Sequence, residues 1–194
     1  MSASAETSSP AADMSRNIGK VALCGVLAGL SVAIMLMTYI APFMTYALPM
    51  VAGALILIPS IEYGSPTALM MYVAVAAVSM ITVGDKEAAL FYLVLFGIYP
   101  IIKKYFEKTG KIVLEYILKF VYFNAIILAT YYVAVVLLGL PFEDSEVFGK
   151  YALPVLMAAG NVAFFVYDLC LTRCVVIYVN RLQPRISKIF NTSR

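Results

Sequence analysis

The chain of 194 residues contains no histidine, no tryptophan and only three cysteines, and charged residues make up 13% of it. Without histidine it lacks the usual protein ligand of transition metals and the side chain that most often moves protons near neutral pH. Cys170 and Cys174 do not fill this gap, because no histidine or group of carboxylates accompanies them. We therefore expect no catalytic residue, no metal site and no cofactor.

The chain also lacks a glycine-rich phosphate-binding loop of the P-loop type. It therefore cannot hydrolyse ATP itself, and the energy for any transport must come from a gradient or a partner. The formal net charge is only +3. This value gives no reason to expect nucleic acid as a partner, and it is explained by membrane topology and contact with anionic lipid.

Long apolar segments make up most of the sequence. Hydrophobic residues make up 63% of the chain and the mean hydropathy is +0.92, so too little polar surface remains to cover a core in water. In lipid every backbone amide must be bonded within its own segment, which makes helices of apolar runs of roughly twenty residues. No alternating strands typical of a barrel occur. The sequence predicts an all-α, multi-pass integral protein of the cell membrane.

Six apolar segments predict six transmembrane helices. Their limits are about 21–41, 46–62, 66–83, 88–102, 112–139 and 151–178. The first is longer than a signal-peptide core and has no cleavage site after it, so we expect it to be retained. We expect a transmembrane domain over 19–181, a disordered cytoplasmic tail at 1–18 and a basic cytoplasmic tail at 182–194.

The distribution of cations predicts that both termini face the cytoplasm. Six spans place ten Lys and Arg residues on one side, whereas the other side has only Lys86 and Lys150 among several carboxylates. Because cytoplasmic loops are enriched in Lys and Arg, the basic side is cytoplasmic. Its ten cations are Arg16, Lys20, Lys103, Lys104, Lys108, Lys111, Arg181, Arg185, Lys188 and Arg194.

A ridge of small residues runs along the first predicted helix. Gly25, Gly29 and Ala33 recur every four residues and therefore share one face. Small side chains let another helix approach closely in a membrane. The ridge is thus a docking surface, either for a helix of this chain or for a partner protein.

These features together resemble the substrate-binding S component of energy-coupling factor (ECF) transporters, over roughly residues 20–180. The shared features are six helices with both ends inside, a short second span, the small-residue ridge and the absence of a nucleotide site. In that family an Ala-x-x-x-Ala type motif on the first helix contacts the transmembrane T component, and two cytoplasmic ATPases supply energy. Gly25, Gly29 and Ala33 match this motif, with Gly replacing Ala twice. The resemblance implies capture of a vitamin-like small molecule from outside.

Polar residues in the outer and central layers of the spans are candidates for contact with such a ligand. The directions of the spans place Tyr92, Tyr131 and Asn161 there, and Asn124 lies two helical turns before Tyr131 on nearly the same face. An amide at that depth needs a hydrogen bond, either from a neighbouring helix or from a ligand. Both interpretations of Asn124 and Asn161 stay open.

The turn between the third and fourth spans carries three consecutive charges. Asp85 can cap the following helix, and Glu87 favours the positive end of its dipole. Alternatively, Lys86 or Glu87 binds a charged group of the ligand at the mouth of the pocket, as the resemblance implies.

Charged residues also lie within the predicted spans. Asp168 in the sixth and Lys119 in the fifth have similar depths, and Glu115 is four residues before Lys119. An unpaired charge there would cost several kcal/mol. We therefore expect a network of Glu115, Lys119 and Asp168, which serves either to fix the register of the helices or to relay protons or ions.

Three functions are compatible with the sequence. The first is the substrate-binding subunit of an ECF-type importer. The second is a membrane scaffold of a cell-envelope complex, similar to the rod-shape MreD-like proteins in size and helix number. The third is a stand-alone secondary carrier that uses Asp168 and Lys119. A ligand pocket favours the first function, a filled interior the second, and a water path to Asp168 from both sides the third.

Overall fold

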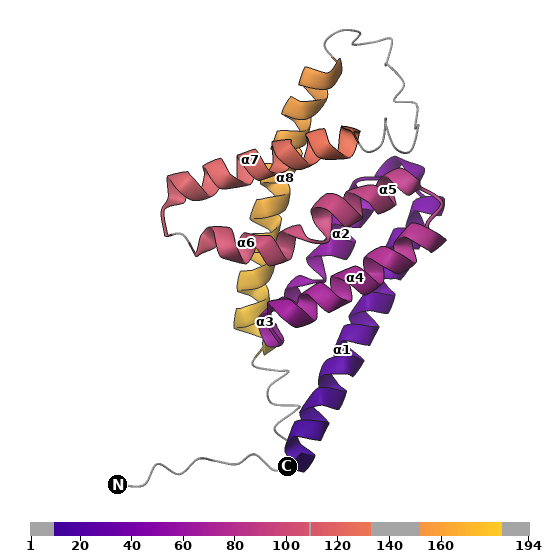
Figure 1. The fold of residues 1–194 in the computed structure, drawn as a ribbon, viewed down its shortest axis with the longest axis vertical. Helices are drawn as coiled ribbons and strands as arrows, with labels where there is room; N and C mark the ends of the chain where they lie inside the picture. Colours follow the sequence, from indigo (N-terminus) through magenta and orange to yellow (C-terminus); the bar gives the residue numbers. More distant parts are fainter. Residues whose placement is uncertain (1–9, 109, 133–151, 184–194) are drawn as a thin grey trace.

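The computed structural model describes residues 10–108, 110–132 and 152–183. Most of these residues are helical, and none of them forms a strand. In Figure 1, α1 runs beside α4, while α8 crosses both α6 and α7. The elements are α1 (Pro10–Leu36), η1 (Met37–Tyr39), η2 (Pro42–Met44), α2 (Ala47–Ala54), α3 (Leu57–Glu62), α4 (Ser65–Thr82), α5 (Lys86–Phe91), η3 (Tyr92–Phe96), α6 (Tyr99–Glu107), α7 (Ile112–Tyr132), α8 (Ala152–Ile177) and η6 (Tyr178–Leu182).

Five of the described helical segments are long and apolar enough to cross a membrane. They are Asn17–Tyr39, Ser65–Thr82, Lys86–Glu107, Val113–Thr130 and Met157–Arg181. The prediction of an all-helical protein is confirmed for the described residues, and five such helices are the pattern of a multi-pass membrane protein. The expected end of the fifth span, at 133–139, lies outside the described residues.

The second predicted span is shorter and is interrupted. Apolar helix covers Ala47–Glu62 but is divided into α2 and α3 at Leu55 and Ile56. Pro59 has no N–H to donate to the carbonyl of Leu55 one turn earlier, which explains the break. That carbonyl instead accepts from the N–H of Ile58 at 3.3 Å.

The first helix begins earlier than the sequence predicted. The tail expected to be disordered at 1–18 is helical from Pro10 onward, and residues 1–9 lie outside the described residues. Proline suits the first turn of a helix and the two alanines that follow it favour helix strongly, so α1 extends beyond the membrane-length segment.

The fourth predicted span continues past residue 102 through α6 to Glu107. Within this segment the N–H of Gly97 donates to the carbonyl of Tyr92 at 2.8 Å, five residues back, which gives the π-helical turn η3. Pro100 leaves the carbonyl of Phe96 without a donor in its own helix. The hydroxyl of Tyr167 on α8 donates to that carbonyl at 3.2 Å. Because Pro100 leaves this carbonyl free within its own helix, the carbonyl can accept the bond that joins the fourth predicted span to α8.

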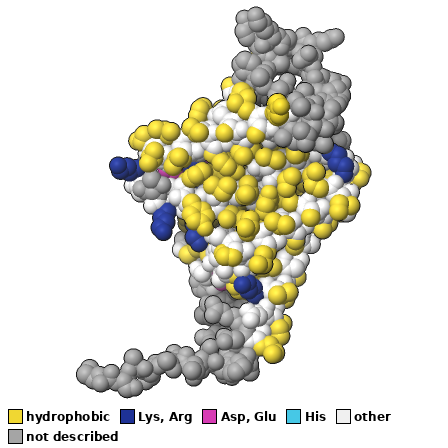
Figure 2. Space-filling model, viewed as in Figure 1, with side chains coloured by type: hydrophobic (Ala, Val, Ile, Leu, Met, Phe, Trp, Pro, Cys, Tyr) yellow, Lys and Arg dark blue, Asp and Glu magenta, His cyan; other side chains and the backbone are white. Residues whose placement is uncertain are grey.

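Two clusters of buried apolar side chains hold the helices together. The first packs α1, α2, α4 and α5 around residues such as Met35, Ile56 and Val75. The second is rich in aromatic rings and packs α3, η3, α6, α7 and α8 around residues including Phe123 and Tyr167. Figure 2 shows hydrophobic side chains spread over the face in view, with Lys and Arg toward its edges. Such a surface suits contact with lipid.

Candidate functional site

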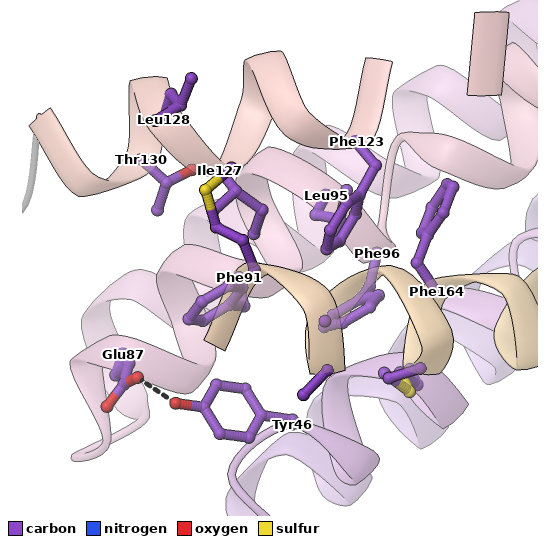
Figure 3. Close-up of a pocket in the computed structure, with 15 residues that line it drawn as sticks. Tyr46, Glu87, Phe91, Leu95, Phe96, Phe123, Ile127, Leu128, Thr130 and Phe164 are labelled. Atoms are coloured by element: carbon purple, nitrogen blue, oxygen red, sulfur yellow. Dashed lines mark hydrogen bonds between the residues drawn. The ribbon is translucent and has the colours of Figure 1, made fainter. Parts of the chain in front are cut away.

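A partly enclosed cavity of about 280 Å³ lies where α2, α5, η3, α7 and α8 meet. Its volume is close to the lower limit of small-molecule pockets, roughly 300 Å³. Figure 3 shows the lining side chains converging from these segments. The lining consists of Tyr46, Met50, Glu87, Phe91, Leu95, Phe96, Phe123, Ile127, Leu128, Thr130, Met157, Ala159, Gly160, Ala163 and Phe164.

Four phenylalanine rings form much of the cavity wall. The rings of Phe123 and Phe164 stack with their centroids 4.7 Å apart and join α7 to α8. Phe91 and Phe96 lie one turn of helix apart, with centroids separated by 6.3 Å. The wall therefore offers aromatic faces and aliphatic side chains, and suits an apolar or aromatic ligand.

The polar end of the cavity is formed by Tyr46 and Glu87. The hydroxyl of Tyr46 donates to Oε1 of Glu87 at 2.6 Å, a bond that Figure 3 marks. The ring of Tyr46 meets Phe91 edge to face, with centroids 5.1 Å apart. Thr130 also lines the cavity, but its hydroxyl donates to the carbonyl of Ile126 at 2.8 Å. Among the described lining residues, Glu87 is thus the main polar group that a ligand can bind.

The three consecutive charges at the start of α5, Asp85, Lys86 and Glu87, have separate roles. Asp85 caps α5 by accepting from the N–H of Ala88 at 3.0 Å, and it also accepts from the hydroxyl of Thr45 at 2.8 Å. Lys86 binds two carbonyls near the end of α4, those of Met80 at 2.9 Å and Val83 at 3.0 Å. Of the two residues predicted to bind a ligand here, Glu87 lines the cavity and Lys86 does not.

The amides predicted to contact a ligand bind each other. The side-chain nitrogen of Asn124 donates to the oxygen of Asn161 at 3.1 Å, and the reverse bond measures 3.2 Å. Each nitrogen also donates to the carbonyl four residues back, in Phe120 and Met157 respectively. The pair links α7 to α8, and neither amide lines the cavity. The geometry therefore matches the interpretation as a bond between helices.

The two predicted tyrosines do not add to the described lining. Tyr92 is fully buried, and its hydroxyl has no hydrogen-bond partner among the described residues. Its ring packs near that of Tyr72 at a centroid distance of 6.3 Å. The side chain of Tyr131 lies outside the described residues.

Asp168 is the centre of a buried ion cluster. One carboxylate oxygen accepts from the hydroxyl of Tyr99 at 2.6 Å and from Lys103, and the other accepts from Lys119 at 2.8 Å. Lys119 also pairs with Glu115 at 2.5 Å. Asp168, Lys103 and Lys119 expose 5% or less of their surface. The structure thus brings together Glu115, Lys119 and Asp168, as the sequence predicted.

The sequence interpretation missed Lys103, Tyr99 and Glu107. It placed Lys103 in a basic cytoplasmic loop, whereas the residue is 2% exposed inside α6 and binds Asp168 on α8. Glu107 pairs with Lys103 at 2.8 Å, one turn further along α6. The spacing of these residues four apart was a signal that could have predicted a helix here.

The ion cluster and the cavity share a wall. Tyr99, whose hydroxyl binds Asp168, packs its ring edge to face on Phe164, with centroids 4.7 Å apart. Phe164 lines the cavity one turn before Asp168 on α8. The charges therefore lie behind the aromatic wall of the cavity and not on it.

The small-residue ridge of α1 faces outward. Gly25, Gly29 and Ala33 are exposed, and a Cβ atom added to either glycine would meet no described atom within 4 Å. Packing of the ridge against another described helix of this chain is therefore not observed, and the face is open to lipid or a partner.

Comparison of the chain with known protein families, curated proteins and solved structures gives no match. The interpretation of its function therefore depends on the features of this chain alone: its apolar helices, the cavity, the ion cluster and the open ridge.

Proposed function

We propose that this chain is the substrate-binding membrane subunit of an ECF-type importer. It crosses the membrane six times with both termini in the cytoplasm, captures a small molecule from outside, and docks on a T component that works with ATPase subunits. The observation that carries the proposal is the aromatic cavity of about 280 Å³, which has the size and lining of a small-molecule site.

The position of Glu87 supports access from outside. The residue lies in the first turn of α5, at the end of the fourth span that the cation distribution assigns to the exterior. Besides the five long helices, the proposal needs one more crossing, and the second predicted span, Ala47–Glu62, supplies it. This segment extends about 24 Å at 1.5 Å per residue. This length is somewhat less than the roughly 30 Å hydrocarbon core, a mismatch that local thinning of the bilayer accommodates.

The exposed ridge on α1 supports docking on a membrane partner. A helix of the T component could approach Gly25 and Gly29 closely, because no described side chain covers them. In this proposal the chain supplies recognition, and the partner complex supplies the energy that the chain cannot obtain from ATP.

The ion cluster favours the stand-alone carrier as a second candidate, since buried charges mark ion pathways in many transporters. However, both oxygens of Asp168 are bonded to protein groups, and each buried lysine has a second carboxylate partner. A saturated cluster of this kind fits a structural role better than transport of an ion.

The test of the proposal is to identify small molecules that co-purify with the full-length protein, using mass spectrometry. The wild type should carry a specific compound that the cavity-filling variant Ala163→Phe lacks, because Ala163 lines the cavity. A double variant, Gly25→Leu with Gly29→Leu, should retain the compound but lose uptake and association with ATPase subunits. A compound retained equally by Ala163→Phe, or uptake that survives the double variant, would contradict the proposal.

A further inference from the structure

We propose that the cavity selects an organic cation with a small aromatic or apolar body, and that Glu87 binds the positive group. This inference rests on the proposed function, because it takes the cavity as the ligand site and specifies the chemistry of its occupant.

The charge of the lining favours a cation. Glu87 is the only charged side chain among the described residues that line the cavity. The neighbouring cation, Lys86, is bound to the carbonyls of Met80 and Val83 at the end of α4, and Asp85 is used as the cap of α5. An anionic ligand would therefore meet a carboxylate without a described cation to balance it.

The hydrogen bond of Tyr46 determines what Glu87 can still bind. Tyr46 donates to Oε1, so its hydroxyl proton is already used and the carboxylate retains acceptor capacity, mainly on Oε2. An ionised carboxylate cannot donate. The group that completes its coordination must therefore be a donor, and a charged ammonium-type donor forms the stronger bond.

The helix places an aromatic surface next to this carboxylate. Glu87 and Phe91 are four residues apart on α5 and share one face, and both line the cavity. Phe91 in turn packs edge to face with Tyr46, so the carboxylate has two rings beside it. A cation near an aromatic face gains attraction from the ring quadrupole in addition to the charge of Glu87.

The spacing of Glu87 and Phe91 along α5 limits the shape of the ligand. The Cβ atoms of residues four apart on a helix are roughly 6 Å apart, so a ligand whose positive group meets Glu87 and whose apolar or aromatic body packs beyond Phe91 needs a separation of at least about that length between the two. The deeper walls, formed by Phe96, Phe123 and Phe164, contain no charged described residue. The volume of about 280 Å³ admits one small ring system and excludes large cofactors.

The experiment compares three probes that share a phenyl ring: 2-phenylethylamine, which is a cation at pH 7, the neutral 2-phenylethanol and the anion phenylacetate. Binding to the full-length protein in lipid nanodiscs is measured by isothermal titration calorimetry, with the signal of empty nanodiscs subtracted. The amine should bind roughly tenfold more tightly than the alcohol, and phenylacetate more weakly than either.

Two variants test the role of the carboxylate. Glu87→Gln should reduce the preference for the amine to about twofold or less. Glu62→Gln is the matched control, since Glu62 also accepts from a tyrosine, Tyr178 at 3.0 Å, but lies outside the cavity lining. It should retain the full preference. A preference that survives Glu87→Gln, or that Glu62→Gln removes as well, overturns the inference.

A third variant separates this inference from the proposed function. Ala163→Phe should abolish binding of both the amine and the alcohol, because it fills the cavity. If the amine and the alcohol bind equally and both are blocked by Ala163→Phe, the cation inference fails and the cavity remains a ligand site. If no probe binds at millimolar concentration, or if Ala163→Phe has no effect, the cation inference and the cavity as ligand site both fail.

Discussion

Replacement of Asp168 by asparagine should remove much of the stability with which α6, α7 and α8 hold together. The substitution preserves the size of the side chain but removes the charge that lies between two buried lysines. Lys103 and Lys119 both bind this carboxylate and are 2% and 5% exposed, so neither can turn to water without a rearrangement. The three residues come from α6, α7 and α8, and the loss would weaken the contacts of α8 with both α6 and α7 at once.

The size of the expected loss in the free energy of unfolding follows from the carboxylates that Lys103 and Lys119 still contact. Removing one member of a buried ion pair usually costs about 3–5 kcal/mol, because the other charge stays buried without compensation. Here Lys103 keeps Glu107 at 2.8 Å and Lys119 keeps Glu115 at 2.5 Å. We therefore expect a loss near the lower end, about 3 kcal/mol. Lys103→Met and Lys119→Met combined with Asp168→Leu and Tyr99→Phe should restore stability to within about 1 kcal/mol, since apolar replacements leave no unpaired charge and no buried hydroxyl without its acceptor at these positions.

The free energy of unfolding can be measured in mixed micelles by titration with sodium dodecyl sulfate, followed by circular dichroism. Cys170→Ser is a suitable control, because Cys170 is exposed on the same helix two residues away and its replacement should change the free energy by about 0.5 kcal/mol or less. If Asp168→Asn lies within about 1 kcal/mol of the wild type, the ion cluster does not hold α6, α7 and α8 together.

Two further comparisons, each between a pair of substitutions, test the packing of the helices. Gly53→Ala should cost about 2 kcal/mol, because the added Cβ would lie 2.3 Å from the carbonyl oxygen of Phe96, whereas Gly29→Ala, with no described atom within 4 Å, should be neutral or stabilising in the same titration. Asn124→Ala and Asn161→Ala should be less than additive when combined, with a coupling energy of about 0.6–1.7 kcal/mol, and strictly additive losses would show that the two amides do not stabilise each other.

Hydropathy predicted the helices well where apolar runs were long and uninterrupted. The third predicted span, 66–83, agrees with α4 at Ser65–Thr82 within a residue or so at each end. Hydropathy failed at the C-terminal end of the fourth predicted span, because it ended the helix at residue 102, before Lys103, whereas α6 continues to Glu107. Lys103 continues the helix since its charge is neutralised by Asp168, a residue 65 positions away. A contact at that separation is not visible in local composition.

Of the described cavity lining the sequence predicted Glu87 alone, and it predicted the core of the separate ion cluster behind the wall. Asp168 and Lys119 stand out because charges are rare in these spans, and their depths could be compared. The phenylalanines of the cavity wall do not stand out, because Phe123 and Phe164 occur in helices whose many apolar side chains are spread around the helix and are not gathered on one face. Which apolar face lines a cavity and which meets lipid is decided by the packing of helices, which a single sequence does not specify.

The ion cluster around Asp168 and the polar end of the cavity at Glu87 differ in how fully their charged groups are hydrogen-bonded. In the ion cluster Asp168 and its two lysines use their bonding capacity on one another and on Glu107 and Glu115, so this region gains a fixed arrangement and offers little to a ligand. At the other end of the wall Glu87 accepts one hydrogen bond among the described residues, from Tyr46, and lines the cavity. Tyr99 and Phe164 connect the two regions through ring contact, so the rigid cluster supports the wall against which a ligand would pack. On this argument, loosening the cluster should weaken binding in the cavity although none of its charges touches the ligand.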